Sequence, residues 1–244
     1  MGILFGNTEI CARLLATGKV EEHVLVAVPN HPIVDERIAD HADLSLFGGD
    51  KIYGSPNVYD VVYSTLSQTF DKEWLTDNLV KGMLIPEGDY PKDILYNCVE
   101  ISGKLFHSLQ HTDPVILQGY GGEKVNMKQG YSKCSCLLIG KSAVITEDPG
   151  VEKLLKSRGI DVLRINRGGV HLCGFEYGFI GGAGGSVGSI LFINGKLSTH
   201  AEYHLIKPFL LKHGIESVEL HEGPLIDCGS ILYFDLCNTR KEVE

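Results

Sequence analysis

The sequence predicts an α/β fold in which four to five repeated strand–helix–strand modules are arranged around a central axis, like the blades of a propeller. Two observations carry this prediction: a long stretch of the chain repeats without gaps, and each repeat combines short apolar runs with one helix. A third is that no Ser- or Pro-rich linker divides the chain, so we expect a single domain over residues 1–244. The modules are clearest at 137–180 and 190–236.

The repeat is visible when Leu154–Phe179 is written above Phe209–Phe234, because the two segments align without a gap. Similar residues then coincide at Leu155 and Leu210, Gly159 and Gly214, Ile165 and Leu220, Gly168 and Gly223, Cys173 and Cys228, and Phe179 and Phe234. Each module leaves an apolar face that only a neighbouring module can cover. The repeat therefore predicts modules that pack side by side around an axis.

The two clear modules contain the same elements in the same order. Each has a strand (137–145 and 190–197), a helix (151–157 and 203–212), a second strand (161–165 and 217–220) and a third (172–180 and 229–236). A glycine follows each helix, and glycine readily adopts the positive φ that ends one. Thr146–Pro149 predicts the start of the first helix, because polar caps, acidic residues and proline favour a first turn.

The N-terminal half repeats the pattern more faintly, which leaves the number of modules at four or five. The expected elements are a strand at Val24–Val28, one or two helical turns at Ile33–Asp40, an apolar run at Leu44–Phe47, and a further unit from Met83 through 98–107 to Gly122. We interpret Tyr53–Asp77 as an insertion.

Composition excludes several classes of protein. Hydrophobic residues make up 43% of the chain and charged residues 22%, which are ordinary globular values. The net charge of −9 argues against a nucleic-acid partner, which clustered Lys and Arg would recognise. No apolar run approaches the ~18 residues of a membrane span. Seven cysteines without a signal-like N-terminal segment indicate free thiols in the cytoplasm. The oligomeric state is not predicted.

Cys228 is the candidate nucleophile, at the start of the last predicted strand in a glycine-flanked segment. A cysteine nucleophile needs a lowered pKa, a nearby base and access to substrate, and a strand end facing a central cavity offers all three. The alternative is a buried cysteine that behaves as a small apolar residue. His171 occupies the corresponding position in the preceding module, 57 residues away. If the modules are related by rotation, the two side chains meet at the axis; otherwise His171 is a loop histidine.

Three carboxylates lie at similar module junctions: Asp50, Glu176 and Asp227. One of them could orient the histidine or bind a cationic substrate. Each could equally be a turn or cap residue. The glycine-rich segment 181–188 is not a phosphate-binding loop, because it lacks the Lys-Ser/Thr ending and leads into a strand.

No metal or other cofactor is predicted. Cys134-x-Cys136 lacks a second pair of ligands. The histidine pairs 107/111 and 200/204 lack the HExxH pattern, and a polar helix face accounts for both.

Several motifs resemble those of the pentein fold, the five-bladed propeller of guanidino-group-modifying enzymes such as arginine deiminases, dimethylargininases and amidinotransferases. Cys228-Gly-Ser230 is similar to their Cys-x-Ser, His171-Leu172 to their His-Leu-Asp, and Gly48-Gly49-Asp50 to the end of their Glu-Gly-Gly-Asp. Cys173 and Phe47 replace the Asp and the Glu of these motifs, and the spacings differ. The segments 129–134 and 178–182 resemble an uncharacterised branch of the same fold.

The resemblance implies two alternative functions. One is a Cys-dependent hydrolase or amidinotransferase that acts on a guanidino compound through a covalent thioether. Cys228 would then be the nucleophile and His171 the acid/base, while Asp50, Asp227 or Glu176 binds the guanidinium. The other is a non-catalytic binding protein, since the same fold also serves as a ribosome anti-association factor. The missing motif carboxylates favour the second function, and the intact Cys and His favour the first.

Overall fold

The computed structural model describes residues 1–236, and these residues form five three-stranded sheets. Each sheet is one blade with an inner, a middle and an outer strand. In that order the blades are β15 (Leu232–Asp235), β1 (Gly2–Gly6) and β2 (Val24–Ala27); β3 (Leu46–Gly48), β4 (Ile52–Gly54) and β5 (Leu79–Lys81); β6 (Val99–Ile101), β7 (Lys104–His107) and β8 (Glu123–Asn126); β9 (Leu137–Ile139), β10 (Ala143–Thr146) and β11 (Asp161–Arg164); β12 (Gly184–Val187), β13 (Ile190–Ile193) and β14 (Glu216–Glu219). We number them first to fifth.

All five blades share one topology. The inner strand pairs antiparallel with the middle strand, and the middle strand pairs parallel with the outer strand. Parallel neighbours need a crossover connection, usually a helix. The crossovers contain α1 (Thr8–Ala16); α2 (Pro56–Leu66) and α3 (Lys72–Asn78); η2 (Leu109–His111) and α4 (Pro114–Gly119); α5 (Pro149–Ser157); and η4 (Leu197–Thr199) and α6 (Tyr203–Lys212). The prediction of repeated strand–helix–strand modules is confirmed.

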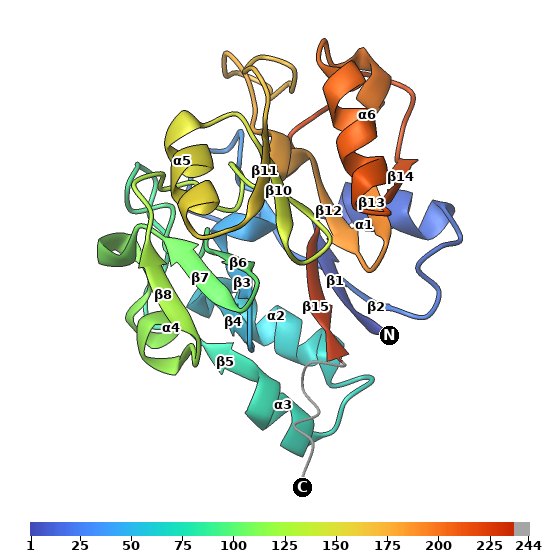
Figure 1. Cartoon of the computed structure of the whole chain (residues 1–244). Helices are drawn as coiled ribbons and strands as arrows, with labels where there is room; N and C mark the ends of the chain where they lie inside the picture. The colour runs from blue at the N-terminus through green and yellow to red at the C-terminus, as the bar shows by residue number, and fades with distance from the viewer. Residues whose placement is uncertain (237–244) are drawn as a thin grey trace, which may run out of the picture.

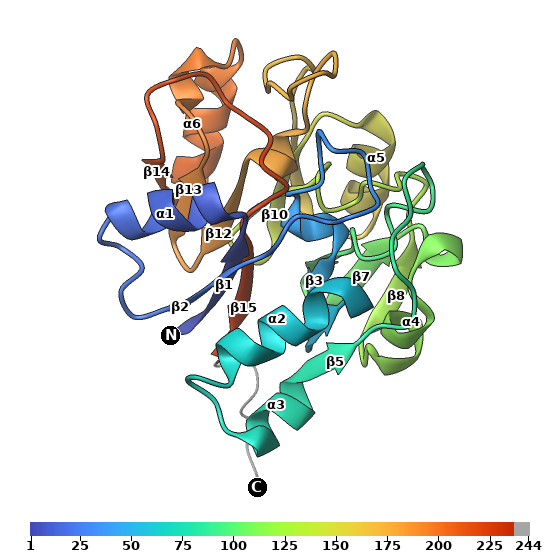
Figure 2. The same cartoon turned by 180° about the vertical axis from the view of Figure 1, so that it is seen from behind.

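The inner strands meet around one axis. β12 contacts β9 and β15, β15 contacts β3, and β3 contacts β6. The long helices lie towards the outside (Figure 1), and the view from behind shows the same arrangement (Figure 2). The last strand, β15, joins the first blade by pairing with β1, so both ends of the described chain belong to one blade. This pairing closes the ring of blades.

The local sequence accounts for the helix starts. Asp148 accepts hydrogen bonds from the amides of Gly150 and Val151, and Pro149 occupies the first turn of α5, as its sequence predicts. Asn7 caps α1 in the same way through the amide of Ile10. Apolar clusters then join neighbouring blades; one combines Ile145 of β10 with Ile193 of β13. Helix starts therefore depend on residues adjacent in sequence, and the apolar packing depends on contacts between adjacent blades.

Some predicted elements were wrong. No strand forms at 172–180; the inner strand of the fifth blade is β12, and η3 (Ile180–Ala183) precedes it. The reason is that the connection 165–183 is longer than the corresponding connection 220–231, so the gapless alignment is shifted beyond β11. Residues 33–40 form turns instead of a helix. Tyr53–Asp77 is no insertion, since it supplies β4, α2 and α3 of the second blade.

Among residues 1–236 no helix combines the length and apolar character that crossing a bilayer requires. One predicted free thiol, Cys237, lies outside the described residues, and the six described cysteines are free.

Candidate functional site

The segments that precede the inner strands converge at the axis, and we call them the lead-in segments. Ser230 in the first blade donates a hydrogen bond to Asp43 in the second, and its Oγ also lies 3.0 Å from the carbonyl oxygen of Gly181 in the fifth. Asn97 in the third blade donates to the carbonyl oxygen of Asp43 and accepts from the amide of Lys133 in the fourth. Residues from the lead-in segments of all five blades, through side-chain or backbone atoms, therefore meet within hydrogen-bond distance.

Asp43 is the hub of this network and is fully buried. Its Oδ2 lies 2.5 Å from Ser230 Oγ and 3.0 Å from the sulfur of Cys134. Its Oδ1 has no hydrogen-bond partner among the described residues. Burial, together with the carboxylates of Asp43 and Asp227, holds the pKa of the Cys134 thiol well above its usual value. Cys134 is therefore a protonated thiol that donates to a carboxylate in the resting structure.

A cavity of about 310 Å³ opens beside this hub, and we call it the acidic cavity. Its chemical groups are two carboxylates, four aromatic rings, an imidazole and a thiol: Asp227 and Glu176; Tyr131, Phe175, Tyr177 and Phe179; His41; and Cys134. Neither lysine nor arginine is among the described side chains that line it. Its volume is within the range of small-molecule sites.

Asp227 is the buried carboxylate of the acidic cavity. Its oxygens accept hydrogen bonds from the amides of Phe179 (2.9 Å) and Gly229 (3.1 Å), and His41 Nδ1 lies 3.9 Å away. Burial raises the pKa of Asp227, and the nearby His41 opposes that shift. A Cβ on Gly182 would lie 2.0 Å from Asp227 Oδ1, so glycine at this position makes room for the carboxylate.

Aromatic side chains form a wall of the acidic cavity. The rings of Tyr131 and Phe179 are 5.9 Å apart, and Tyr177 meets Phe179 edge to face. The guanidinium of Arg37 lies 4.1 Å from the ring centroid of Phe175. It also donates a hydrogen bond to the carbonyl oxygen of Gly174, the residue before Phe175. A guanidinium group is thus already stacked on one of the lining rings.

The predicted nucleophile, Cys228, lies in the apolar core between the first and fifth blades. Its neighbours there include Leu4, Leu14 and Phe192, and its sulfur donates to the carbonyl oxygen of Gly182 at 3.2 Å. Burial and the surrounding carboxylates hold the pKa of the thiol well above its usual value. Cys228 is not among the residues that line the acidic cavity.

The predicted acid/base, His171, contacts the lead-in segment of the first blade with its backbone and not with its imidazole. It forms an isolated bridge with Ile226 and accepts a hydrogen bond from the amide of Asp227. The side chain is exposed and does not line the acidic cavity. The residues immediately before β12 are Gly181-Gly182-Ala183, so the position that converges on the axis in the fifth blade carries no imidazole.

The three predicted carboxylates are divided between two ends of the ring. Asp227 and the exposed Glu176 both line the acidic cavity. Asp50 lies beyond the other end of β3, where it is exposed and accepts hydrogen bonds from Tyr53 and the amide of Gly121. The structure therefore brings two of the three together.

Sequence reasoning missed His41, Asp43 and Cys134 as members of one site. The sequence pattern indicates Cys134 only as a possible metal ligand, and no group of three metal-binding side chains occurs within residues 1–236. The available signal was position: each of the three lies just before an apolar inner strand. That signal depends on locating strands of three residues, which are too short to stand out.

Comparison with known proteins identifies the fold and the family. A structure of DDAH from Pseudomonas aeruginosa with citrulline is similar at a TM-score of 0.54, with 9% identity over 89% of this chain and 91% of that one. The agmatine deiminase of C. jejuni gives 0.50, with 13% identity over 95% and 81%. An amidinotransferase from Microseira wollei gives 0.52, with 10% identity over 97% and 80%.

These similar structures have the pentein fold, which this chain shares. No curated protein matches the sequence. The profile of one family, described as a family of unknown function (DUF6873), matches residues 10–232. The chain is therefore a member of the DUF6873 family and has the pentein fold.

Proposed function

We propose that this protein binds a small guanidino-type cation in the acidic cavity. The observation that carries the proposal is the buried carboxylate of Asp227 in a cavity with aromatic walls and without a lining lysine or arginine among the described residues. Asp227 has two amide donors and His41 beside it, but no lysine or arginine among the described residues, so a bound cation would further offset the cost of burying its charge. Glu176 adds a second carboxylate among the lining residues.

A guanidinium fits this chemistry better than an ammonium. It is planar, stacks on aromatic rings and pairs with carboxylates through two parallel hydrogen bonds. The contact between Arg37 and Phe175 supports this preference, because it is a guanidinium stacked on a lining ring. The similar structures include an agmatine deiminase and a DDAH complexed with citrulline, which supports a ligand of the same class.

Calorimetric titration tests the proposal with agmatine and arginine as cations and citrulline as the neutral analogue. We expect the cations to bind and Asp227→Asn to weaken binding by at least about tenfold. Asp50→Asn is the matched control, since Asp50 does not line the acidic cavity. This variant should bind agmatine and arginine as tightly as the wild type does. Glu176→Gln removes an exposed carboxylate and should weaken binding of the cations only a few-fold. Unaltered affinity in a folded Asp227→Asn variant would overturn the proposal.

The second candidate is a thiol-dependent hydrolase or amidinotransferase, which a thiol among the lining residues favours. Cys134 lies 3.0 Å from Asp43 Oδ2, a carboxylate that can accept its proton. A bound cation would also favour the thiolate. The sulfur would attack the guanidinium carbon, and the departing amine would leave with a proton. Water or an acceptor amine would then release the product and restore the thiol.

Cys228 and His171 stay the predicted nucleophile and acid/base of the same chemistry, so the test compares two thiols. Ureido product from arginine-like compounds is measured for the wild type, Cys134→Ala and Cys228→Ala. Loss of turnover in only one of the two folded variants identifies the nucleophile. If both variants turn over substrate as fast as the wild type, neither thiol is the nucleophile. If the wild type shows no turnover either, the proposal is reduced to binding.

A further inference from the structure

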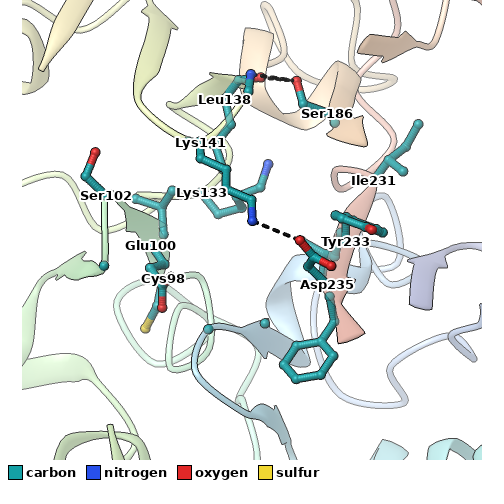
Figure 3. Close-up of a pocket in the computed structure, with 18 of the residues that line it drawn as sticks. Cys98, Glu100, Ser102, Lys133, Leu138, Lys141, Ser186, Ile231, Tyr233 and Asp235 are labelled. Carbon is teal, nitrogen blue, oxygen red and sulfur yellow. Dashed lines mark hydrogen bonds and ion pairs between the residues drawn. The ribbon is translucent and has the colours of Figure 1, made fainter. Parts of the chain in front are cut away.

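A second cavity lies along the axis and is independent of the acidic cavity. It measures about 470 Å³, and residues from the inner strands of all five blades line it; we call it the channel cavity (Figure 3). Lys133 is one of its lining residues, while the next residue, Cys134, lines the acidic cavity. The fourth lead-in segment therefore separates the two cavities.

Lys133 is a buried lysine without a carboxylate partner. Its side chain and backbone together are 6% exposed. Its ammonium donates to the carbonyl oxygen of Gly181 at 3.3 Å, and no carboxylate oxygen within residues 1–236 lies within 4.0 Å. An ammonium has three hydrogens to donate, and burying its charge without a counter-ion is unfavourable.

The acidic groups of the channel cavity are already engaged by other residues. Asp235 forms an ion pair with Lys141 at 2.8 Å, which Figure 3 shows as a dashed line. Glu100 interacts with the hydroxyl of Tyr120, and burial raises the pKa of its carboxyl group. The hydroxyl of Ser186 is committed to the carbonyl oxygen of Leu138. Because Asp235 and Lys141 pair with each other, Lys133 is the lysine of this lining that has no carboxylate within ion-pair distance among the described residues.

We propose that the channel cavity binds a small oxyanion, a carboxylate or a phosphate, with the ammonium of Lys133 as its counter-ion. The anion supplies the acceptors that Lys133 lacks, and Lys133 is one of the residues that line the channel cavity. The volume exceeds what a single water fills and suits a ligand of several non-hydrogen atoms. This site does not depend on the proposed guanidino ligand.

Two anions of different geometry distinguish a phosphate-type ligand from a carboxylate. The full-length protein is titrated with inorganic phosphate and with acetate, each against sodium chloride at equal ionic strength, and thermal unfolding is recorded. We expect saturable stabilisation by at least one of the two, because a ligand of the native state raises the unfolding temperature. Stabilisation by phosphate alone indicates a phosphate-type ligand, and by acetate alone a carboxylate. An absence of saturable stabilisation with both would overturn the proposal.

Lys133→Met is the decisive variant, since methionine keeps an unbranched apolar stem and removes the charge. We expect it to abolish the anion-dependent shift and to unfold at a higher temperature than the ligand-free wild type, because a buried unpaired charge has been removed. Lys72→Gln, at an exposed lysine of α3, is the matched control and should retain the full shift. Lys133→Arg keeps the positive charge and should retain part of the anion-dependent shift. Equal shifts in wild type and Lys133→Met would contradict the assignment.

Discussion

The hydroxyl of Ser230 donates a hydrogen bond of 2.5 Å to Oδ2 of Asp43, although 187 residues separate the two in the chain. The bond joins the lead-in segments of the first and second blades beside the point where β15 closes the ring. Both side chains are fully buried, and Ser230 adopts a positive φ of 67°. An unfavourable backbone conformation at a buried polar contact indicates that the surrounding packing holds this bond in place.

Ser230→Ala should therefore destabilise the protein by about 2 kcal/mol, because a buried carboxylate oxygen loses its closest donor. The positive φ remains unfavourable for alanine, so no relief of strain offsets the loss. Urea unfolding measures the change. Ser189→Ala, at an exposed serine, is the matched control and should change stability by less than about 0.5 kcal/mol. A similarly small change at Ser230 would show that the contact with Asp43 contributes little.

The architecture was predictable where the pattern was local. The helix at Tyr203–Lys212 matches α6, and the cap at Thr146–Pro149 matches the start of α5, since both depend on neighbouring residues. The strand predicted at 172–180 was wrong because the longer connection before β12 shifts the repeat by an amount that similar residues do not reveal. In the N-terminal half the inner strands have three residues each, too few to show periodicity.

The site was harder to predict, because it depends on which residues precede the inner strands in space. The sequence places Asp227 and Glu176 near module junctions, and both line the acidic cavity. Asp50 is also near a predicted module junction, yet it follows β3 and so lies at the opposite end of that strand. Cys134 joins the site through contacts with Asp43, 91 residues away, and Asn97. Sequence patterns do not report such long-range contacts.

Cys228 should react slowly with thiol reagents in the native protein. The thiolate is the reactive form, and burial together with nearby carboxylates raises the pKa of this thiol. With iodoacetamide at pH 7.5, peptide mass spectrometry should show Cys173, which is exposed, labelled at least roughly tenfold faster than Cys228. Labelling at equal rates in urea is the control. Rapid labelling of Cys228 in the native state would instead support its predicted role as nucleophile.

His107 should stay neutral well below the pH at which a peptide histidine, with a pKa near ~6.5, becomes charged. It is fully buried, with Nδ1 2.7 Å from Thr112 Oγ1 and Nε2 3.1 Å from the carbonyl oxygen of Gly130, and burial lowers its pKa to about 4. Because the native pKa lies below the unfolded value, the stabilisation is present above pH 6.5 and is lost as the pH falls towards 4.

Long-range proton–nitrogen NMR spectra measure this directly for His107. The signals of its imidazole should stay those of the neutral ring between pH 7 and about 5. His107→Gln removes the corresponding signals and so assigns them. A transition of the assigned signals close to pH 6.5 would contradict the lowered pKa.

Glu147 should make the native state less stable as the pH rises through neutrality. It follows β10, its Oε2 accepts from the amide of Ile180 at 3.0 Å, and its Oε1 has no partner among the described residues. Burial raises its pKa from 4.5 to about 7. Because the native pKa lies above the unfolded one, the stabilisation by the protonated form is complete below pH 4.5 and is lost as the pH rises to 7.

Glu147→Gln removes this titration and keeps an oxygen that can accept from Ile180. The stability of the variant relative to the wild type should therefore rise between pH 4 and pH 8, by roughly 3 kcal/mol. Urea unfolding of both proteins at pH 4, 6 and 8 gives the difference at each pH. Glu73→Gln, at an exposed glutamate of α3, is the matched control and should differ from the wild type by less than about 0.5 kcal/mol throughout. A difference between Glu147→Gln and the wild type that does not vary with pH would show that the Glu147 carboxyl has the same pKa in the folded and unfolded states, and would contradict the raised pKa.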